Sequence, residues 1–336
     1  MKRIFFILVL SMAFLGASAQ DRHRFRLLEY NVENCFDTIH NPGKDDVAFL
    51  PDGEYRWNSG RYWRKLSDLS RVILDLGGLQ PVDIVALCEV EGDSVLHDLT
   101  RRTRLAALDY EYVVTDSPDL RGINVALLYQ PLTFRLVSHS SFSVPYNLEK
   151  ERPTRDVLLC SGVLLTGDTL DVIAVHFPSR RGGERASRPY RIRAAKVVRH
   201  ITDSLCTVRS HPYIAVMGDC NDTPSDPSLR HIAQGGFVNL SASAKAINDF
   251  AEPVRAWRSI TGTYCFQQDW SRIDNILLSQ PAVDHFFIPL PAQIFAPDYL
   301  LETDKDGFHI PFRTYRGPAY HGGISDHLPL YLDILY

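Results

Sequence analysis

The sequence of 336 residues lacks several features that would place it in a common class of protein. It has no CxxC pair and no regular cysteine spacing, so a structural zinc site is not expected. It has no internal repeats, no low-complexity segment and no long linker. Lysine and arginine (36) do not exceed aspartate and glutamate (40), and the net charge is −4. Non-specific attraction to nucleic acid is therefore not a property of the whole protein, and any polyanion site must be local.

The chain also lacks a second long apolar run after its N-terminus. Residues 1–20 carry Lys2 and Arg3, an apolar stretch from Ile4 to about Leu15, and small residues ending at Ala19. This pattern predicts a cleaved signal peptide over residues 1–19 and a secreted or periplasmic protein. A membrane anchor is the alternative, but the stretch is shorter than the roughly 20 residues that a spanning helix needs. Removal of the two N-terminal cations takes the net charge from −4 to −6.

What the chain does contain is a series of short apolar or alternating runs of strand length. They lie at 25–31, 83–90, 110–115, 123–129, 156–165, 170–176, 213–219, 272–279 and 328–335. Amphipathic helices are predicted at 61–76 and about 185–206, with shorter ones near 94–108 and 226–234. The stretches 240–270 and 281–322 are predicted as loops. The pattern indicates an α+β protein in which two packed sheets are flanked by helices, as one domain over residues 20–336.

Polar side chains stand at the margins of these predicted strands. They are Asn31, Glu89, His176, Asp219, Asn221, Asp274 and the pair Asp326–His327. If the strands alternate in direction within packed sheets, such margins can gather at one edge. A site built from many short loops is where function usually concentrates.

Each of these residues also has an ordinary structural explanation. Asn31 could terminate a strand, and residues 218–224 could form an Asx-rich turn. His176 could be a hydrogen-bonded core histidine. Glu89 is harder to explain in this way, because it directly follows five apolar residues, and a buried carboxylate needs a metal or a cationic partner.

Taken together, six segments resemble the endonuclease/exonuclease/phosphatase superfamily, which has the deoxyribonuclease I-like fold. The segments are EYNVEN (29–34), IVALCEVEG (84–92), IAVHFPS (173–179), VMGDCNDTP (216–224), WSRIDNILLS (270–279) and GGISDHLPL (322–330). Their order and approximate spacing match from about residue 25 to the end. The resemblance implies a four-layer α/β/β/α sandwich of two mixed sheets and a metal-dependent phosphoesterase.

The resemblance also implies a site for a hard divalent cation, Mg²⁺ or alternatively Mn²⁺ or Ca²⁺. Glu89 matches the principal metal carboxylate of the family, and Asn31 matches the neighbouring amide. Asp326 resembles a metal ligand or a residue that supports one. Glu33 falls where some apurinic-site endonucleases carry a metal-binding Asp, although strand pleating could bring it to the same edge for another reason.

The same resemblance suggests the catalytic residues. His327 matches the histidine that meets the scissile phosphate, and Asp274 matches the carboxylate that orients it. Asp219 and Asn221 resemble the pair that positions the attacking water. His176 resembles a second histidine that contacts the phosphate or protonates the leaving group. The sequence does not settle which group is the general base.

Departures from the family patterns narrow the range of expected substrates. Apurinic-site endonucleases usually have Tyr in place of His176, so the match favours the deoxyribonuclease I and sphingomyelinase branches. Inositol polyphosphate phosphatases typically have Arg soon after the Asp-x-Asn, whereas Asp222 and Thr223 follow here. Cys220 and Cys88 replace residues that are common in the family, and neither change should abolish catalysis.

A local positive field follows His176. Between Arg180 and Arg199 the chain has eight cations and a single acid, Glu184. Much of this stretch could be a solvated helix face. Arg180 and Arg181 precede two glycines that would let a loop approach a ligand, so they are candidate phosphate contacts, with Arg121 as a further one.

Three functional hypotheses follow. The first is a secreted nuclease, expected to be a monomer, that cuts phosphodiester bonds of nucleic acid by direct water attack. The second is the same chemistry on a phospholipid or a small phosphoester, for which the apolar stretch 285–301 would form exposed loops. The third is a binding protein that kept the fold without activity.

Overall fold

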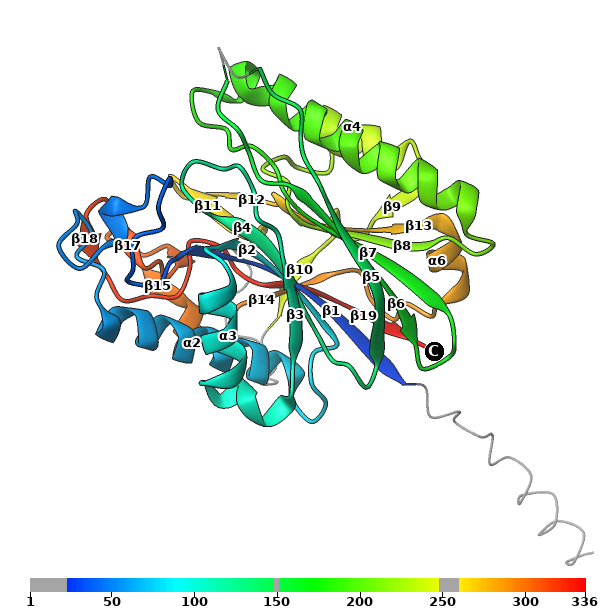
Figure 1. Ribbon diagram of the computed structural model, residues 1–336, viewed down its shortest axis with the longest axis horizontal. Coiled ribbons are helices and arrows are strands. Elements are labelled where there is room, and N and C mark those ends of the chain that lie inside the picture. Colours follow the sequence, from blue (N-terminus) through cyan, green and yellow to red (C-terminus); the bar gives the residue numbers. More distant parts are fainter. Residues whose placement is uncertain (1–22, 148–150, 248–259) are drawn as a thin grey trace, which may run out of the picture.

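The computed structural model describes residues 23–147, 151–247 and 260–336 (Figure 1). The predicted signal peptide, residues 1–19, lies outside the described residues. Within the described ranges, no helix has both the length and the apolar character that crossing a membrane requires.

Two β-sheets form the centre of the molecule (Figure 1). One has seven strands in the order β10-β14-β19-β1-β2-β4-β3, and the other has six in the order β5-β6-β7-β8-β13-β9. The first comprises β10 (Lys245–Ile247), β14 (Gln293–Phe295), β19 (Leu330–Leu335), β1 (Arg24–Cys35), β2 (Ile84–Val90), β4 (Asn124–Tyr129) and β3 (Glu111–Val114). The second comprises β5 (Phe134–Phe142), β6 (Val157–Leu164), β7 (Thr169–His176), β8 (Tyr213–Asp219), β13 (Asp274–Ser279) and β9 (Phe237–Asn239). Both sheets mix parallel and antiparallel pairs.

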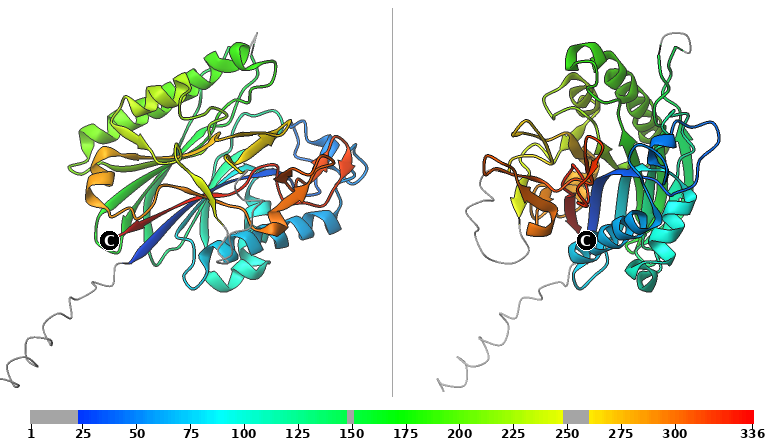
Figure 2. Two further views of the ribbon diagram at one scale, coloured as in Figure 1. Left: turned by 180° about the vertical axis from the view of Figure 1, so that it is seen from behind. Right: turned by 90° about the vertical axis from the view of Figure 1, so that its left-hand side faces the viewer.

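Helices cover the outer face of each sheet, and Figure 2 shows the same layers from behind and from the side. The seven-stranded sheet is covered by α2 (Ser59–Gly77) and α3 (Asp93–Arg101), and the six-stranded sheet by α4 (Glu184–Val208) and α5 (Pro227–Ala233). Shorter elements are α6 (Gln280–His285), η1 (Val47–Phe49), η2 (Arg104–Leu108) and η4 (Asp298–Leu300). This arrangement confirms the predicted four-layer sandwich.

The amphipathic pattern of α2 explains how its layer is held. Leu66, Leu69 and Val72 recur at helical spacing on one face, and all three are buried against the seven-stranded sheet. The side chain of Asn58 accepts a hydrogen bond from the N–H of Arg61, which caps the helix start. The apolar side chains of the two sheets and of α2 and α3 form one large core, and a second core lies beneath α4.

The structure differs from the sequence prediction at β5, a polar strand at the edge of the six-stranded sheet, and in the stretches that were expected to be loops. β5 was not predicted, because it is a sheet edge whose residues are mostly exposed, so it lacks apolar alternation. The stretches expected to be loops contain α6, the sheet strands β10 and β14, and three short hairpins. These hairpins pair β11 (Tyr264–Phe266) with β12 (Asp269–Ser271), β15 (Leu301–Thr303) with β16 (His309–Pro311), and β17 (Tyr315–Arg316) with β18 (Ala319–Tyr320).

The apolar stretch 285–301 is also mostly internal. Phe286, Ile294 and Phe295 are buried in the large core, and of the large hydrophobic residues in the stretch only Phe287 and Leu290 are more than half exposed. A packing role accounts for most of this stretch, which weakens the argument for exposed lipid-binding loops.

The strand directions bring the polar strand margins to one edge. β1 runs parallel to β2, and β7 runs parallel to β8, so each pair ends on the same side. β13 runs antiparallel to β8, and β19 antiparallel to β1, so these two strands begin on that side. In register, His176 lies opposite Asp219, and Asp219 lies opposite Asp274. The edge predicted from the sequence therefore exists.

Gly218 makes the close approach of β8 to β7 possible next to Asp219. Its φ is 145°, and a Cβ placed there would lie 1.9 Å from the carbonyl oxygen of Val175. We expect Gly218→Ala to lower the free energy of unfolding by about 1–3 kcal/mol, because the strands must separate to admit the methyl group. Thermal or urea unfolding measures this change. Gly92→Ala is the matched control, since a Cβ at Gly92 meets no atom within 4 Å; an equal loss in both variants would contradict the steric explanation.

Candidate active site

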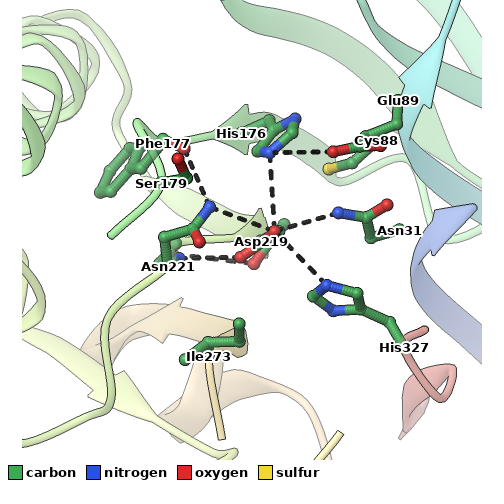
Figure 3. Close-up of polar contacts among 12 residues, drawn as sticks. Asn31, Cys88, Glu89, His176, Phe177, Ser179, Asp219, Asn221, Ile273 and His327 are labelled. Carbon is green, nitrogen blue, oxygen red and sulfur yellow. Dashed lines mark hydrogen bonds and ion pairs between the residues drawn. The ribbon is translucent and has the colours of Figure 1, made fainter. Parts of the chain in front are cut away.

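Asp219 stands at the centre of a cluster of polar side chains at the shared strand edge (Figure 3). Its Oδ2 accepts hydrogen bonds from the side-chain amides of Asn31 (3.0 Å) and Asn221 (3.2 Å). The same oxygen lies 3.5 Å from Nε2 of His176 and 3.9 Å from Nε2 of His327. Burial and the nearby Asp274 carboxylate raise the pKa of Asp219 to about 7. A carboxylate with such a pKa can accept a proton near neutral pH.

His327 is held by Asp274, as the sequence predicted for this pair. Nδ1 of His327 lies 2.8 Å from Oδ2 of Asp274, which also accepts a hydrogen bond from the hydroxyl of Thr263. Burial opposes a charge on His327, but the ion pair with Asp274 outweighs it and raises the pKa well above the usual value. His327 is therefore a cation whose Nε2 faces the centre of the site.

His176 differs from His327 in charge. Burial lowers the pKa of His176 well below its usual value, and the cations Arg155 and Arg121 act in the same direction. Its Nε2 faces both Asp219 and Glu89, whose Oε1 is 3.9 Å away. The site thus contains one neutral and one charged imidazole, and such divergent environments typically separate acid and base roles.

Glu89, the second-to-last residue of β2, has a strained backbone conformation. Its φ is 67°, and Glu33, Asn34 and Asn221 nearby also have positive φ. Non-glycine residues in this region cost free energy, and they concentrate at functional sites. Oε2 of Glu89 accepts a hydrogen bond from the N–H of Asn34 at 2.9 Å, whereas Oε1 has Arg121 at 3.4 Å. Burial would raise the pKa of Glu89, but Arg121 and the Asn34 N–H outweigh it and lower the pKa.

The carboxylate oxygens of Glu89 and Asp219 fit a hard divalent cation. The Glu89 and Asp219 carboxylates face the same nitrogen of His176, and Glu89 Oε1 accepts a long hydrogen bond of 3.4 Å from Arg121. The ligand atoms of Asp219, Asp274 and His327 also lie within 4.8 Å of one another. In that second group Asp274 and His327 bind each other directly, so this group could transfer protons, and the oxygen donors near Glu89 could hold a metal.

Asn31 joins the cluster through Asp219. Its Oδ1 accepts the N–H of Glu33 at 3.0 Å while its amide nitrogen donates to Asp219. This orients the amide and leaves one lone pair of Oδ1 for a further ligand.

The other two predicted metal residues lie beside the cluster and have different partners. The carboxylate of Glu33 accepts the N–H groups of Thr314 (2.8 Å) and Tyr315 (3.4 Å), so it holds the loop after β16. Burial, with the nearby Asp326 charge, raises the pKa of Glu33 to about 7. Asp326 forms an ion pair with Arg313.

The three predicted phosphate-binding arginines also have different environments. Arg180 donates to the backbone oxygen of Asn221 at 2.7 Å and to Asp226 at 3.0 Å, so it braces the loop that carries Asn221. Arg181 is exposed, and it has no hydrogen bond or ion pair with any residue of the described ranges. Arg121 lies over Glu89.

Sequence reasoning missed Glu29, which is fully buried in β1 behind His327. Neither carboxylate oxygen has a hydrogen-bond partner among the described residues. Burial and the negative charges of Asp274 and Asp219 raise its pKa well above the usual value. An acid within the apolar run FRLLEYN was a visible signal. Sequence reasoning also missed Arg155, which is buried and donates to the backbone oxygen of Phe177 at 2.6 Å. The sequence around Arg155 gave no signal of this role.

The raised pKa of Glu29 predicts a pH-dependent stability. Above about pH 4.5, the usual pKa of a glutamate, the unfolded chain loses the Glu29 proton and the folded protein keeps it, so stability falls as pH rises. Glu29→Gln removes this penalty. We expect the difference in Tm between the variant and the parent to be small near pH 4.5 and to grow in favour of the variant toward pH 8. A difference that does not change with pH would contradict a protonated Glu29.

Comparisons with known proteins agree with this geometry. A family model described as the endonuclease/exonuclease/phosphatase family matches residues 27–335. No curated protein matches the chain.

Several solved structures share the fold. An endonuclease/exonuclease/phosphatase family protein from Bacteroides thetaiotaomicron is 16% identical, with a TM-score of 0.58, and the match covers 94% of this chain and 98% of that one. A mannosyl-6-phosphatase from the same species is also 16% identical, with a TM-score of 0.58 and coverage of 93% and 100%. TDP2 from D. rerio, solved with a single-strand DNA product, is 13% identical, with a TM-score of 0.56 and coverage of 93% and 98%.

Proposed function

Because this chain belongs to the endonuclease/exonuclease/phosphatase family, whose members hydrolyse phosphoester bonds, we propose that it is a secreted nuclease that cleaves phosphodiester bonds with a divalent metal. The observation that carries the proposal is the convergence of two asparagines and two histidines on one buried carboxylate, Asp219. Direct hydrolysis requires an oriented water, a proton acceptor and positive charge beside the phosphate. The cluster supplies these groups from its own side chains.

Each residue has a defined part in this mechanism. Asp219, with its pKa of about 7, accepts a proton from the attacking water, and Asn221 and Asn31 orient its carboxylate. His327, charged and held by Asp274, donates to a non-bridging phosphate oxygen. His176, neutral and close to Asp219, contacts the same phosphate. As the water oxygen bonds to phosphorus, the bond from phosphorus to the leaving oxygen breaks, and the leaving oxygen takes a proton from the solvent. A divalent ion, Mg²⁺, Mn²⁺ or Ca²⁺, held by Glu89 with Asn31 nearby, would neutralise the negative charge of the phosphoryl group.

A small phosphomonoester is the second candidate substrate. It is favoured by the structural similarity to a mannosyl-6-phosphatase. That protein is 16% identical to this chain, so the similarity concerns the fold alone. A phospholipid has weaker support, because the apolar stretch 285–301 is mostly buried.

Purified mature protein tested on four substrates would separate these functions. Single-stranded DNA or RNA, mannose 6-phosphate, sphingomyelin and bis(p-nitrophenyl) phosphate are each incubated with Mg²⁺, with Mn²⁺ or with EDTA. We expect metal-dependent cleavage of the nucleic acid and of the generic diester. Release of phosphate from the sugar alone would favour the phosphatase, and headgroup release would favour the lipid enzyme. The absence of any metal-dependent turnover would overturn the hydrolase proposal.

Detection of the cleaved chain outside the cytoplasm tests the signal peptide. Expression of the full chain in a bacterial host, followed by fractionation and N-terminal sequencing, is expected to give a protein that begins at Gln20.

A further inference from the structure

A groove of about 640 Å³ opens beside Glu89, at the border of the active site. Its walls come from the loop 119–121, from residues on both sides of the gap in the described chain at 148–150, and from the beginning of α4. The volume lies in the range of sites that bind small organic molecules, about 300–1,000 Å³. Any substrate whose phosphate meets Asp219 and Glu89 can therefore extend into this groove.

The free charges of the groove are positive. Two of its acids are already paired, because Glu151 binds Arg193 and Asp119 binds Arg155. Arg152 and Arg181 are exposed at the groove and form no hydrogen bond or ion pair with any residue in the described parts of the chain. Arg121 adds a third cation between the groove and Glu89. In a chain with a net charge of −4, Arg152 and Arg181, both without a partner among the described residues, mark a place for an anion.

Aromatic rings accompany these cations. Tyr146 and Tyr190 line the groove, and Tyr190 is 39% exposed. A positively charged groove with aromatic side chains is typical of proteins that bind single-stranded nucleic acid, since phosphates contact the arginines and bases stack on the rings. A phosphorylated sugar or a lipid headgroup would use the cations but would have no base to place against the tyrosines.

We propose that this groove binds the nucleotide next to the scissile phosphate of a single strand, with Arg152 and Arg181 on its phosphate and Tyr146 or Tyr190 against its base. The assignment rests on the proposed nuclease function and makes it more specific. It predicts that a single strand is preferred over substrates that have only one phosphate. Arg152 and Tyr146 come from a segment that the sequence did not connect with the site, whereas Tyr190 lies in the cation-rich stretch between Arg180 and Arg199.

Binding of labelled strands tests this assignment without any turnover. Fluorescence anisotropy in EDTA compares a fluorescein-labelled hexathymidylate with an abasic strand of the same length. The double variant Arg152→Gln/Arg181→Gln is expected to weaken the affinity for both strands about tenfold, because it removes two charged contacts. It should also reduce the slope of log K against log salt by about 0.7 for each lost phosphate contact. Tyr190→Ala with Tyr146→Ala should weaken only the base-bearing strand, by about fivefold or more.

The controls separate this inference from the proposed function. Arg104→Gln removes an exposed arginine from η2, in the outer layer beside α3, and should leave both affinities unchanged. Unchanged binding by the arginine variant would overturn the groove as a phosphate site. Equal binding of both strands, unaffected by the tyrosine variant, would overturn the assignment to a nucleotide. If these variants weaken binding as expected but no phosphoester is ever hydrolysed, the groove assignment stands and the proposed catalytic function fails.

Discussion

Replacing Asp219 with asparagine is expected to lower kcat by about 10³-fold, within the range of about 10²- to 10⁴-fold for the loss of a general base. The amide has nearly the same shape, but it cannot accept the proton of the attacking water. It would also present an NH₂ group or a weaker acceptor to Asn31 and Asn221, both of which now donate to the carboxylate. The favourable field that Asp219 exerts on the charged His327 would be lost as well.

Steady-state hydrolysis of bis(p-nitrophenyl) phosphate with saturating metal measures this loss. The control variant Asp203→Asn makes the same chemical change on α4, where the Asp203 side chain is 61% exposed and pairs with Arg199. This variant should leave kcat unchanged. Circular dichroism and Tm should show that both variants fold, because Asp219→Asn removes a desolvated charge. A folded Asp219→Asn protein with parental kcat would exclude Asp219 from the reaction.

The second large effect is a loss of metal affinity, which we expect for Glu89→Gln. Glu89 brings a charged oxygen to the edge of the site, and its pKa is lowered, so the carboxylate is ionised at neutral pH. Glutamine keeps the length of the side chain but loses the charge that a hard cation requires. We expect Mn²⁺ binding to weaken by about 100-fold and kcat/KM to fall with it at limiting metal.

Isothermal titration calorimetry with Mn²⁺ measures the affinity directly, independently of turnover. The matched control is Glu111→Gln in β3, whose side chain is 51% exposed and pairs with Arg101, and which should not change metal binding. If Glu89→Gln binds Mn²⁺ as tightly as the parent protein, the ion is held elsewhere. The group of Asp219, Asp274 and His327 would then be the next site to test.

Most of the longer strands and the long helices could be predicted from local periodicity. Alternation and apolar runs depend only on which face of an element is buried, so β7, β8 and α2 could be predicted with boundaries close to those observed, whereas β1 continues four residues beyond its predicted end at Asn31. The short strands after β13 could not, since their pairing is set by distant partners: β14, for example, joins the sheet beside β19 and β10. β5 was missed for a different reason, because a mostly exposed strand at the edge of a sheet lacks the apolar signal.

The pairing of His327 with Asp274 was proposed from the resemblance, and the structure brings the two side chains together. Their strands begin at one edge because β13 and β19 both run antiparallel to strands that end there. The orientation of Glu33 was not available from its position two residues after Asn31. The left-handed backbone at Glu33 and Asn34 breaks the alternation of the strand, and the Glu33 carboxylate binds the N–H groups of the loop at 314–315.

The sequence by itself determined which side chains stand at the ends of strands, because a polar residue after an apolar run is a local feature. Only the tertiary structure decided which cations remain unpaired around them. Arg180 binds Asp226 and the Asn221 backbone, whereas Arg152 and Arg181 line the groove with Glu89 and have no partner in the described part of the chain. Such pairing depends on contacts between segments far apart in the chain, and local patterns contain no information about those distances.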